Sequence, residues 1–189
     1  KITKEDLETL KEAIQLSASS YGLQPYKVLI IEDVETRKKL REASWDQSQI
    51  TDASHVLVFV NMTDFDDSLV DDYIHNVGVV RNIDTSILNG YADFMKSKLT
   101  PLPKDVKSAW TSKQAYIAVG NLLSAAADLK IDACPIEGFE AADYNNILGL
   151  IAKNLNASVV VTIGYRSEED ETQHYKKVRK SKNNLFTTI

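Results

Sequence analysis

The sequence is short of cysteine and of long hydrophobic stretches. Its single cysteine, Cys134, excludes a disulfide within the chain and is typical of a protein from a reducing cytoplasm. The longest apolar runs, such as residues 28–31 and 56–60, fall far short of the roughly 20 residues that span a bilayer, and residues 1–6 have no apolar signal-peptide core. We therefore expect a cytoplasmic protein that does not interact with membranes.

Several familiar site patterns are also absent. The chain has neither GxGxxG nor GxxxxGK[ST], so a Rossmann dinucleotide site and a P-loop lose their main sequence support. Its three histidines, His55, His75 and His174, show no metal-ligand spacing, and we identify no Ser-His-Asp arrangement. A net charge of -5 argues against a general nucleic-acid binder. We therefore expect neither a metal site nor a nucleic-acid partner.

What the chain does have is a composition suited to one globular domain. It contains 189 residues, of which 43% are apolar, so we expect a single domain over residues 1–189. Thr3 and Asp6 resemble a capping box ahead of apolar residues at helical spacing, which predicts a helix over residues 4–18. Local composition further predicts a strand over residues 26–31 and a short charged helix over residues 33–43.

The rest of the chain predicts two buried strands around a long helical region. Continuous β-branched runs at residues 55–60 and 157–163 are typical of strands buried on both faces. Residues 66–130 between them are expected to be mostly helical, with a loop at Pro101 and Pro103. Residues 112–129 are apolar on nearly every face, which implies burial in a core or against a second subunit. Few strands, long helices and no regular βαβ alternation indicate an α+β fold.

Three separated motifs carry a specific resemblance. They are SSYGLQPY at residues 19–26, WDQSQITDASH at residues 45–55 and PIEGF at residues 135–139. In order and spacing they resemble motifs of the FMN-dependent nitroreductase family, in particular its oxygen-insensitive NAD(P)H nitroreductases and dihydropteridine reductases. The resemblance covers nearly the whole chain. It implies a nitroreductase-like fold, in which helices flank a central, mainly antiparallel sheet, and an intertwined homodimer.

The same resemblance implies an FMN site. Serine hydroxyls and backbone N–H groups in the first motif suit phosphate and ribityl oxygens, and a late Lys-x-Arg pair suits the phosphate. In the family a backbone N–H of the Glu-Gly turn meets flavin N5. A solvated basic tail is the alternative for the Lys-x-Arg pair. For Gln114, near the start of the apolar helix, the alternative is a position on the helix surface. The residues expected to bind FMN are Ser19, Ser20, Gln24, Asp46, Gln49, Gln114, Pro135, Glu137, Gly138, Lys177 and Arg179.

Two of these positions depart from the family's pattern. Many relatives have Asn where this chain has Asp46 and Lys where it has Gln49, and that Lys stabilises the negative charge that develops at flavin N1 and O2 on reduction. Gln49 carries no charge, and Asp46 would repel an anionic N1. We therefore hypothesise a flavin that is harder to reduce than in the Lys-bearing relatives. A plain surface loop is the alternative for both residues.

The resemblance finally implies an FMN-dependent NAD(P)H oxidoreductase. NADH or NADPH would pass hydride to flavin N5, and a planar nitroaromatic, quinone or pterin-like acceptor would then receive the electrons by a ping-pong mechanism. The cofactor carries this chemistry, so Glu137 is interpreted as a positioning residue and no side chain is assigned as acid or base. The alternatives are a specialised flavin-fragmenting or dehalogenating relative, and a flavin-binding protein with little activity.

Overall fold

A four-stranded antiparallel sheet organises the molecule. The computed structural model describes all 189 residues, and its strands are arranged in the order β1-β2-β4-β3. This confirms the α+β class and the antiparallel sheet. The strands are β1 (Tyr26–Ile31), β2 (His55–Met62), β3 (Asp132–Ile136) and β4 (Leu155–Gly164).

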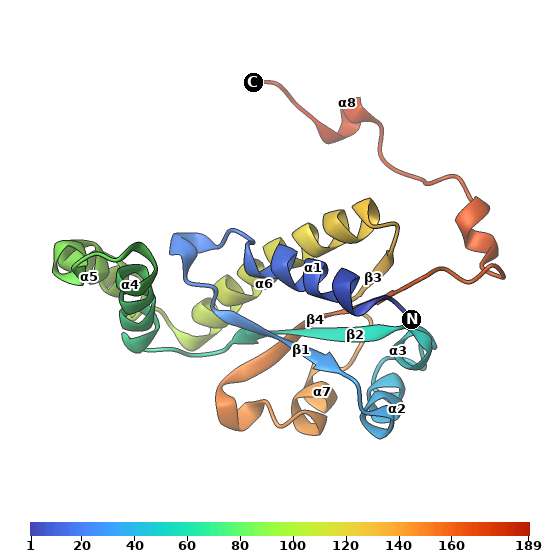
Figure 1. Ribbon diagram of the computed structural model, residues 1–189, viewed down its shortest axis with the longest axis horizontal. Coiled ribbons are helices and arrows are strands. Elements are labelled where there is room, and N and C mark those ends of the chain that lie inside the picture. Colours follow the sequence, from blue (N-terminus) through green and yellow to red (C-terminus); the bar gives the residue numbers. More distant parts are fainter.

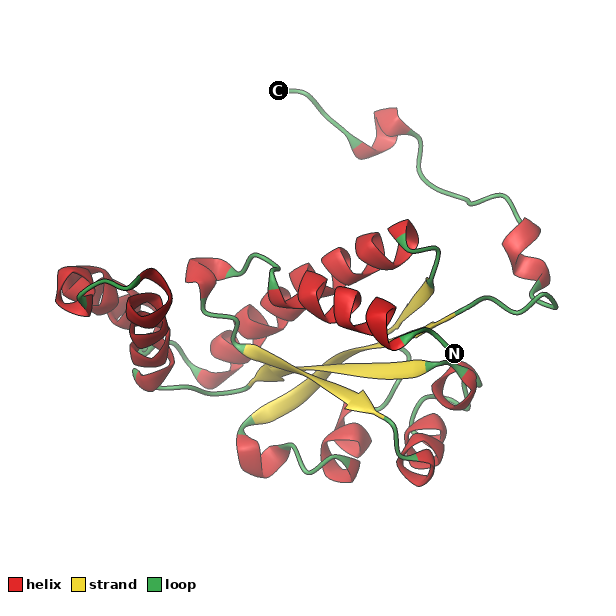
Figure 2. Cartoon of the chain, viewed as in Figure 1, coloured by secondary structure: helices red, strands yellow, loops and turns green.

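Helices cover both faces of the sheet (Figures 1 and 2). On one face lie α1 (Lys4–Gln15) and α6 (Lys104–Asp128), and on the other lie α2 (Val34–Glu42), α3 (Gln49–Asp52) and α7 (Ala141–Ile147). The central strands β2 and β4 are buried along most of their length, as their β-branched runs predict. Along β2, Leu57 and Phe59 pack under α1 and α6, whereas the alternate residues Val56, Val58 and Val60 pack against the opposite layer.

The first helix begins as expected and ends early. Thr3 caps it by accepting a hydrogen bond from the Asp6 backbone N–H at 3.0 Å. The helix stops at Gln15, before the predicted end at residue 18. Beyond it, the Ser17 hydroxyl bonds the Ala13 carbonyl at 2.9 Å, and the chain enters the 3-10 turn η1 (Ser20–Gly22).

The central helical region has two parts. Helix α6 has 25 residues and buries one face, including Ala115, Ala118 and Leu122, while Ile117 on another face is exposed. The other part extends to the left in Figure 1 and has a small apolar core of its own. It consists of α4 (Ser68–Arg81), η2 (Thr85–Leu88) and α5 (Asn89–Leu99). The predicted loop at Pro101 and Pro103 separates α5 from α6.

Strand β3 and the C-terminal residues 165–189 have a secondary structure that the sequence expectations do not describe. Strand β3 was not predicted, because Pro135 and the following turn suggest a loop; the strand is possible because β3 pairs only with β4 and lies at the sheet edge. After β4, residues 165–189 leave the body of the molecule as an extended tail (Figure 1). The tail contains only the short helical turns η4 (Glu171–His174) and α8 (Lys182–Leu185). No helix has the length and apolar character needed to cross a membrane.

Candidate functional site

The turn between α1 and β1 is held by hydrogen bonds from three sides. The Ser20 backbone N–H donates to Gln114 Oε1 at 2.7 Å, and the Gln24 backbone N–H donates to Ser19 Oγ at 3.0 Å. The Gln24 side chain donates to the Gln15 carbonyl at 2.9 Å and so caps the end of α1. Gln114 is 6% exposed, so the helix-surface alternative for this residue is wrong. Its side chain holds the turn in place.

The backbone of this turn takes an unusual path. Tyr21, Gly22 and Gln24 have φ values of 57°, 78° and 44°, all in the left-handed region. Only glycine adopts that region without a steric penalty, so the bonds from Ser19 and Gln114 compensate for local strain. The turn therefore presents a defined backbone path, as a phosphate-binding or ribityl-binding segment requires.

The segment after α2 bends in a similar way. Trp45 and Asp46 have φ values of 53° and 58°. The Asp46 carboxylate accepts a hydrogen bond from Arg41 Nε at 2.7 Å, and Arg41 Nη1 also donates to Thr51 Oγ1 at 3.1 Å. The negative charge of Asp46 therefore has a cationic partner, which its position in the sequence did not reveal.

The segment of residues 43–47 forms hydrogen bonds with the turn that follows β3. The Gln47 side chain donates to the Gly138 carbonyl at 2.8 Å, and the Glu140 backbone N–H donates to the Ala43 carbonyl at 2.8 Å. Trp45 Nε1 donates to Glu140 Oε1 at 3.0 Å. The second and third sequence motifs, far apart along the chain, are thus joined directly.

Gly138 is needed at this junction. A Cβ atom there would lie 2.8 Å from Trp45 Cζ3 and 3.2 Å from Gln47 Nε2. The absence of a side chain at Gly138 therefore makes room for the indole of Trp45, which is itself 69% exposed. Any larger residue would push the indole or the turn out of place.

The other side of the turn is held by α6. The Tyr116 hydroxyl donates a short hydrogen bond to Glu137 Oε1 and lies 3.4 Å from the Ser158 carbonyl oxygen. Burial, and then the neighbouring Glu137 carboxylate, raise the pKa of Tyr116 to about 12. In the sequence Tyr116 is one of the apolar residues of the helical stretch 112–129, so its role is not visible there. The one available signal is that it lies two residues after the candidate Gln114.

A buried polar network supports the strand beneath Tyr116. The register between β2 and β4 shifts at Phe59 and Val60, which leaves Ser158 as the extra residue of a β-bulge. Ser158 Oγ donates to Asn61 Oδ1 at 2.6 Å, and Asn61 Nδ2 donates to Thr111 Oγ1 on α6 at 2.9 Å. These bonds fix α6 over the bulge, and hence the place from which Tyr116 reaches Glu137.

The expected FMN-binding residues fall into three groups within one chain. The first group is Ser19, Ser20, Gln24 and Gln114 at the α1–β1 turn, the second is Asp46, Gln49, Pro135, Glu137 and Gly138 around the end of β3, and the third is Lys177 and Arg179 on the tail. Helix α6 lies between the first two, because Gln114 and Tyr116 are two residues apart and each helical residue turns by roughly 100°. In Figure 1 the turn after α1 lies towards the left end of α6, and β3 lies towards its right end.

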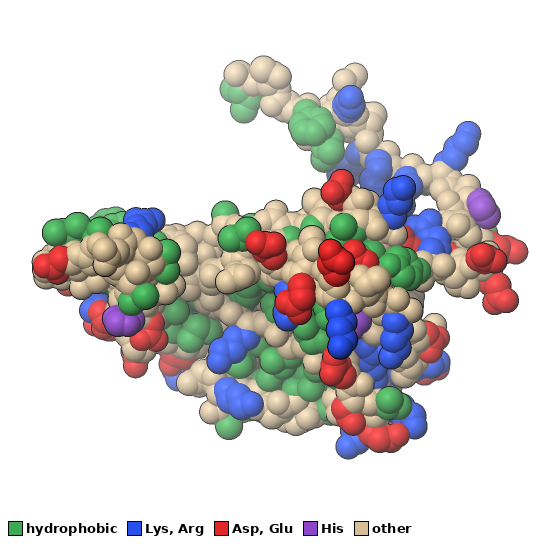
Figure 3. All heavy atoms as spheres, viewed as in Figure 1, with side chains coloured by type: hydrophobic (Ala, Val, Ile, Leu, Met, Phe, Trp, Pro, Cys, Tyr) green, Lys and Arg blue, Asp and Glu red, His purple; other side chains and the backbone are tan.

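The cation pair of the tail stands apart from both turns. Arg179 Nη1 donates to the neighbouring Val178 carbonyl at 2.8 Å, and both Lys177 and Arg179 are exposed. The space-filling view shows the tail projecting from the body, with Lys and Arg side chains along it (Figure 3). One chain therefore does not bring these cations to the serines of the first turn.

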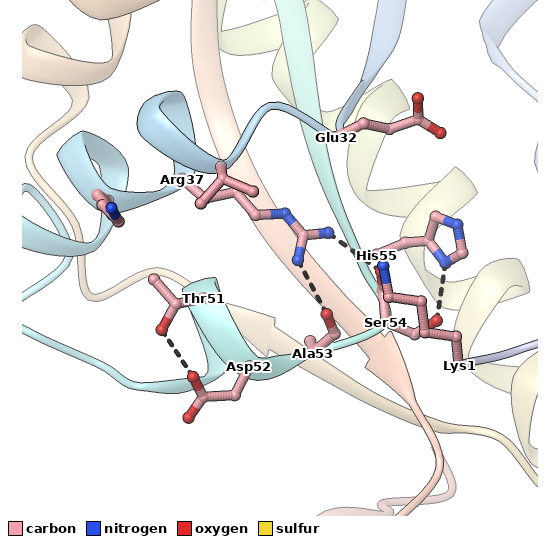
Figure 4. A pocket seen from close by; sticks show the side chains of 10 residues that line it. Lys1, Glu32, Arg37, Thr51, Asp52, Ala53, Ser54 and His55 are labelled. Atoms are coloured by element: carbon pink, nitrogen blue, oxygen red, sulfur yellow. Dashed lines mark hydrogen bonds between the residues drawn. The ribbon is translucent and has the colours of Figure 1, made fainter.

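One cavity borders the second group. It has a volume of about 610 Å³ and has Gln49 and Cys134 among its lining residues, so Gln49 faces the edge strand β3. Another cavity, of about 450 Å³, is lined by none of the expected residues and has Arg37 in its wall (Figure 4). The buried Arg37 guanidinium donates to the carbonyls of Ile31, Ala53 and Ser54 at 2.9, 2.9 and 3.2 Å, so its role is to join the ends of β1 and β2.

Comparisons with known proteins agree with this architecture. The model of the nitroreductase family matches residues 1–165. YfkO of Bacillus subtilis, a predicted NAD(P)H nitroreductase, is 37% identical over 177 residues, which cover 88% of this chain and 80% of YfkO. The crystal structure of the predicted nitroreductase ydfN of Bacillus subtilis has a TM-score of 0.86 at 23% identity and covers 100% of this chain and 89% of its own. A predicted nitroreductase of Exiguobacterium sibiricum, crystallised in complex with FMN, has a TM-score of 0.83 at 19% identity, with 100% and 88% covered.

Proposed function

Because this chain belongs to the nitroreductase family, we propose that it is an FMN-dependent NAD(P)H oxidoreductase acting on planar nitroaromatic, quinone or pterin-like acceptors. The chemistry that FMN would supply when bound is uptake of hydride at N5 from NADH or NADPH, followed by reduction of the acceptor in a separate, ping-pong half-reaction. The observation that carries the proposal is the turn at Glu137 and Gly138, which is clamped by α6 on one side and by Gln47 and Trp45 on the other.

The residues present fit an FMN molecule. The strained α1–β1 turn would hold phosphate and ribityl oxygens through Ser19 and Ser20, and the tail pair Lys177 and Arg179 would supply positive charge to the phosphate. The clamped turn would direct a backbone N–H to flavin N5. These residues bind and orient, while none of them is required to move a proton.

The electrostatics of the pyrimidine edge also suit a working reductase. Asp46 taken alone would oppose flavin reduction, but Arg41 pairs with it at 2.7 Å. The pair brings the local charge close to neutral, since Gln49 is uncharged. The ion pair therefore offsets the charge of Asp46, and the uncharged Gln49 stays as the reason for the alternative of a flavin-binding protein with little activity.

We further infer that two chains build each site as an intertwined homodimer. The α1–β1 turn and the Glu137 turn bond α6 at Gln114 and Tyr116, which point about 200° apart around the helix, so in the proposed site each flavin takes one turn from each chain. Exposed apolar side chains cover the α4–α5 end, as the green patches in Figure 3 show. These include Val80, Ile87, Tyr91 and Phe94, and the tail adds Tyr175, Val178, Leu185 and Phe186. A second copy of this chain would bury these groups and bring the separated residues together.

We also infer a compartment, and the cysteine supports it. Cys134 is exposed and unpaired. An exposed thiol of this kind is typical of a reducing compartment, so we expect the protein to work in the cytoplasm.

The visible spectrum of the purified protein tests the main proposal. We expect flavin absorbance, FMN as the cofactor released on denaturation, and bleaching by NADH or NADPH on the timescale of turnover with nitrofurazone or menadione. Light scattering after size-exclusion chromatography should give twice the mass of the chain. A colourless protein that FMN does not reconstitute would overturn the proposal, and a monomer that binds FMN would overturn only the dimer.

A further inference from the structure

Tyr116 is the hydrogen-bond partner of the Glu137 side chain. The phenol belongs to α6, and the carboxylate belongs to the turn after β3. The Tyr116 hydroxyl donates to Glu137 Oε1, and no other side chain bonds that carboxylate. The phenol is 39% exposed, so it is not part of the packed core that the neighbouring alanines of α6 form.

The place of Tyr116 is itself well determined. The Ser158 carbonyl lies 3.4 Å from the phenol oxygen, and Ser158 is the bulged residue that bonds Asn61. Asn61 in turn bonds Thr111, which is one helical turn and one residue before Tyr116 on α6. The phenol is thus aimed at Glu137 by a connected set of bonds through β2, β4 and α6, which limits the positions that the carboxylate can take.

The opposite side of the turn has a different kind of support. Gln47 donates to the Gly138 carbonyl at 2.8 Å, and the Trp45 indole covers the glycine. These contacts hold the peptide after Gly138. The peptide between Glu137 and Gly138 has one backbone bond, since the Phe139 N–H donates to the Glu137 carbonyl at 2.9 Å. The bond from Tyr116 is the one side-chain bond that holds Glu137.

We propose that Tyr116 is a positioning residue for the flavin, which fixes Glu137 and thereby the direction of the backbone N–H that the Glu137–Gly138 turn offers to N5. This inference rests on the proposed function. In this proposal the hydrogen bond from the Tyr116 hydroxyl fixes the turn, and the charge of Glu137 is not required. Any group that accepts a hydrogen bond at position 137 should therefore preserve the turn, and any loss of the bond from either partner should have the same effect.

The test is a double-mutant cycle on the holoenzyme. Tyr116→Phe and Glu137→Ala should each weaken FMN binding several-fold and slow flavin reduction by saturating NADPH about tenfold, since a small misplacement of reacting atoms has a large effect on rate. The double variant should be no worse than either single variant, because one bond is lost in all three. Glu137→Gln keeps an acceptor oxygen and should stay close to wild type. The measurements are the FMN dissociation constant and the reduction rate constant from rapid mixing.

Tyr165→Phe is the matched control. It also removes a phenol that contacts a carboxylate, Asp6 at 3.3 Å, but far from the Glu137 turn. We expect it to leave both measurements unchanged. The inference is overturned if Tyr116→Phe behaves like this control, if the effects of Tyr116→Phe and Glu137→Ala add, or if Glu137→Gln is as impaired as Glu137→Ala. A wild type that does not bind FMN overturns the proposed function and this inference together.

Discussion

The two turns expected to contact flavin are stabilised in different ways. The α1–β1 turn is held partly by its own residues, with Ser19 and Gln24 bonding within the turn and to the end of α1, and partly by Gln114 from outside. The turn at Glu137 and Gly138 makes no such local side-chain bonds and depends on α6 and on the segment after α2. A turn of the first kind is recognisable from composition, whereas a turn of the second kind has its geometry set by distant residues.

The largest effect is expected from adding a methyl group at the second turn. Gly138→Ala would place Cβ 2.8 Å from Trp45 Cζ3, so the indole or the turn must move. Moving the exposed indole removes its contact with the turn, so we expect FMN binding weakened by roughly tenfold. Gly90→Ala on α5 is the control, because nothing lies within 4 Å of its added Cβ. Equal behaviour of the two variants would show that the second turn is not tightly held.

The first turn is expected to break most readily at its one distant contact. Gln114→Leu removes a buried acceptor and leaves the half-buried Ser20 N–H without its 2.7 Å partner, which costs about 1–3 kcal/mol. Gln24→Ala removes an exposed bond to Gln15 and should cost less than about 1 kcal/mol. Urea unfolding of both variants measures the difference. A larger loss at Gln24 would mean that the turn is stabilised locally after all.

The Arg41–Asp46 ion pair beside the second turn should change the midpoint potential of the flavin. Arg41→Gln leaves Asp46 unpaired, so we expect a lower flavin midpoint potential, because an uncompensated carboxylate opposes the anionic reduced flavin. Adding Asp46→Asn to this variant should restore the potential, and Gln49→Lys in the wild type should raise it. Redox titration of the bound flavin gives these values. An unchanged midpoint potential in Arg41→Gln would mean that the ion pair lies too far from the flavin to influence it.

The smallest effect concerns alkaline pH. The pKa of Tyr116 is raised to about 12 in the folded protein, above the value near 10 of an exposed tyrosine. A group with a raised folded-state pKa favours the folded state most below its unfolded pKa, so this contribution is complete below about pH 10 and is lost between about pH 10 and 12. Stability measured across this window should therefore fall more steeply in the wild type than in Tyr116→Phe. Identical profiles would contradict the raised pKa of Tyr116, to which burial and then the Glu137 carboxylate contribute.

Much of the fold could be predicted because its patterns are local. The buried strands at residues 55–60 and 157–163 lie within β2 and β4, and Thr3 marks the start of α1. Strand β3 could not be predicted in this way. It contains Pro135 and forms only because β4 offers a partner at the sheet edge.

The candidate site divides along the same line. The composition of the α1–β1 turn and the PIEGF motif were recognisable as residues of one site. The contacts of Gln114 with Ser20 and of Gln47 with Gly138 join residues 94 and 91 positions apart, which no local pattern encodes. The pairing of Asp46 with Arg41 could not be predicted either, although the two residues lie only five positions apart. The left-handed bend at Trp45 and Asp46 brings them together, and no sequence pattern predicts that bend.

The sequence by itself determined the family, the α+β class and most of the residues that we propose for FMN binding. Hydrophobic periodicity reports which face of a helix or strand is buried, and the motifs are contiguous, so both can be read without a fold. The tertiary structure decided that Gly138 packs against Trp45, that Tyr116 holds Glu137, and that α6 separates the two turns. These are contacts between elements, and they depend on how the helices pack on the sheet rather than on the order of residues within any one of them.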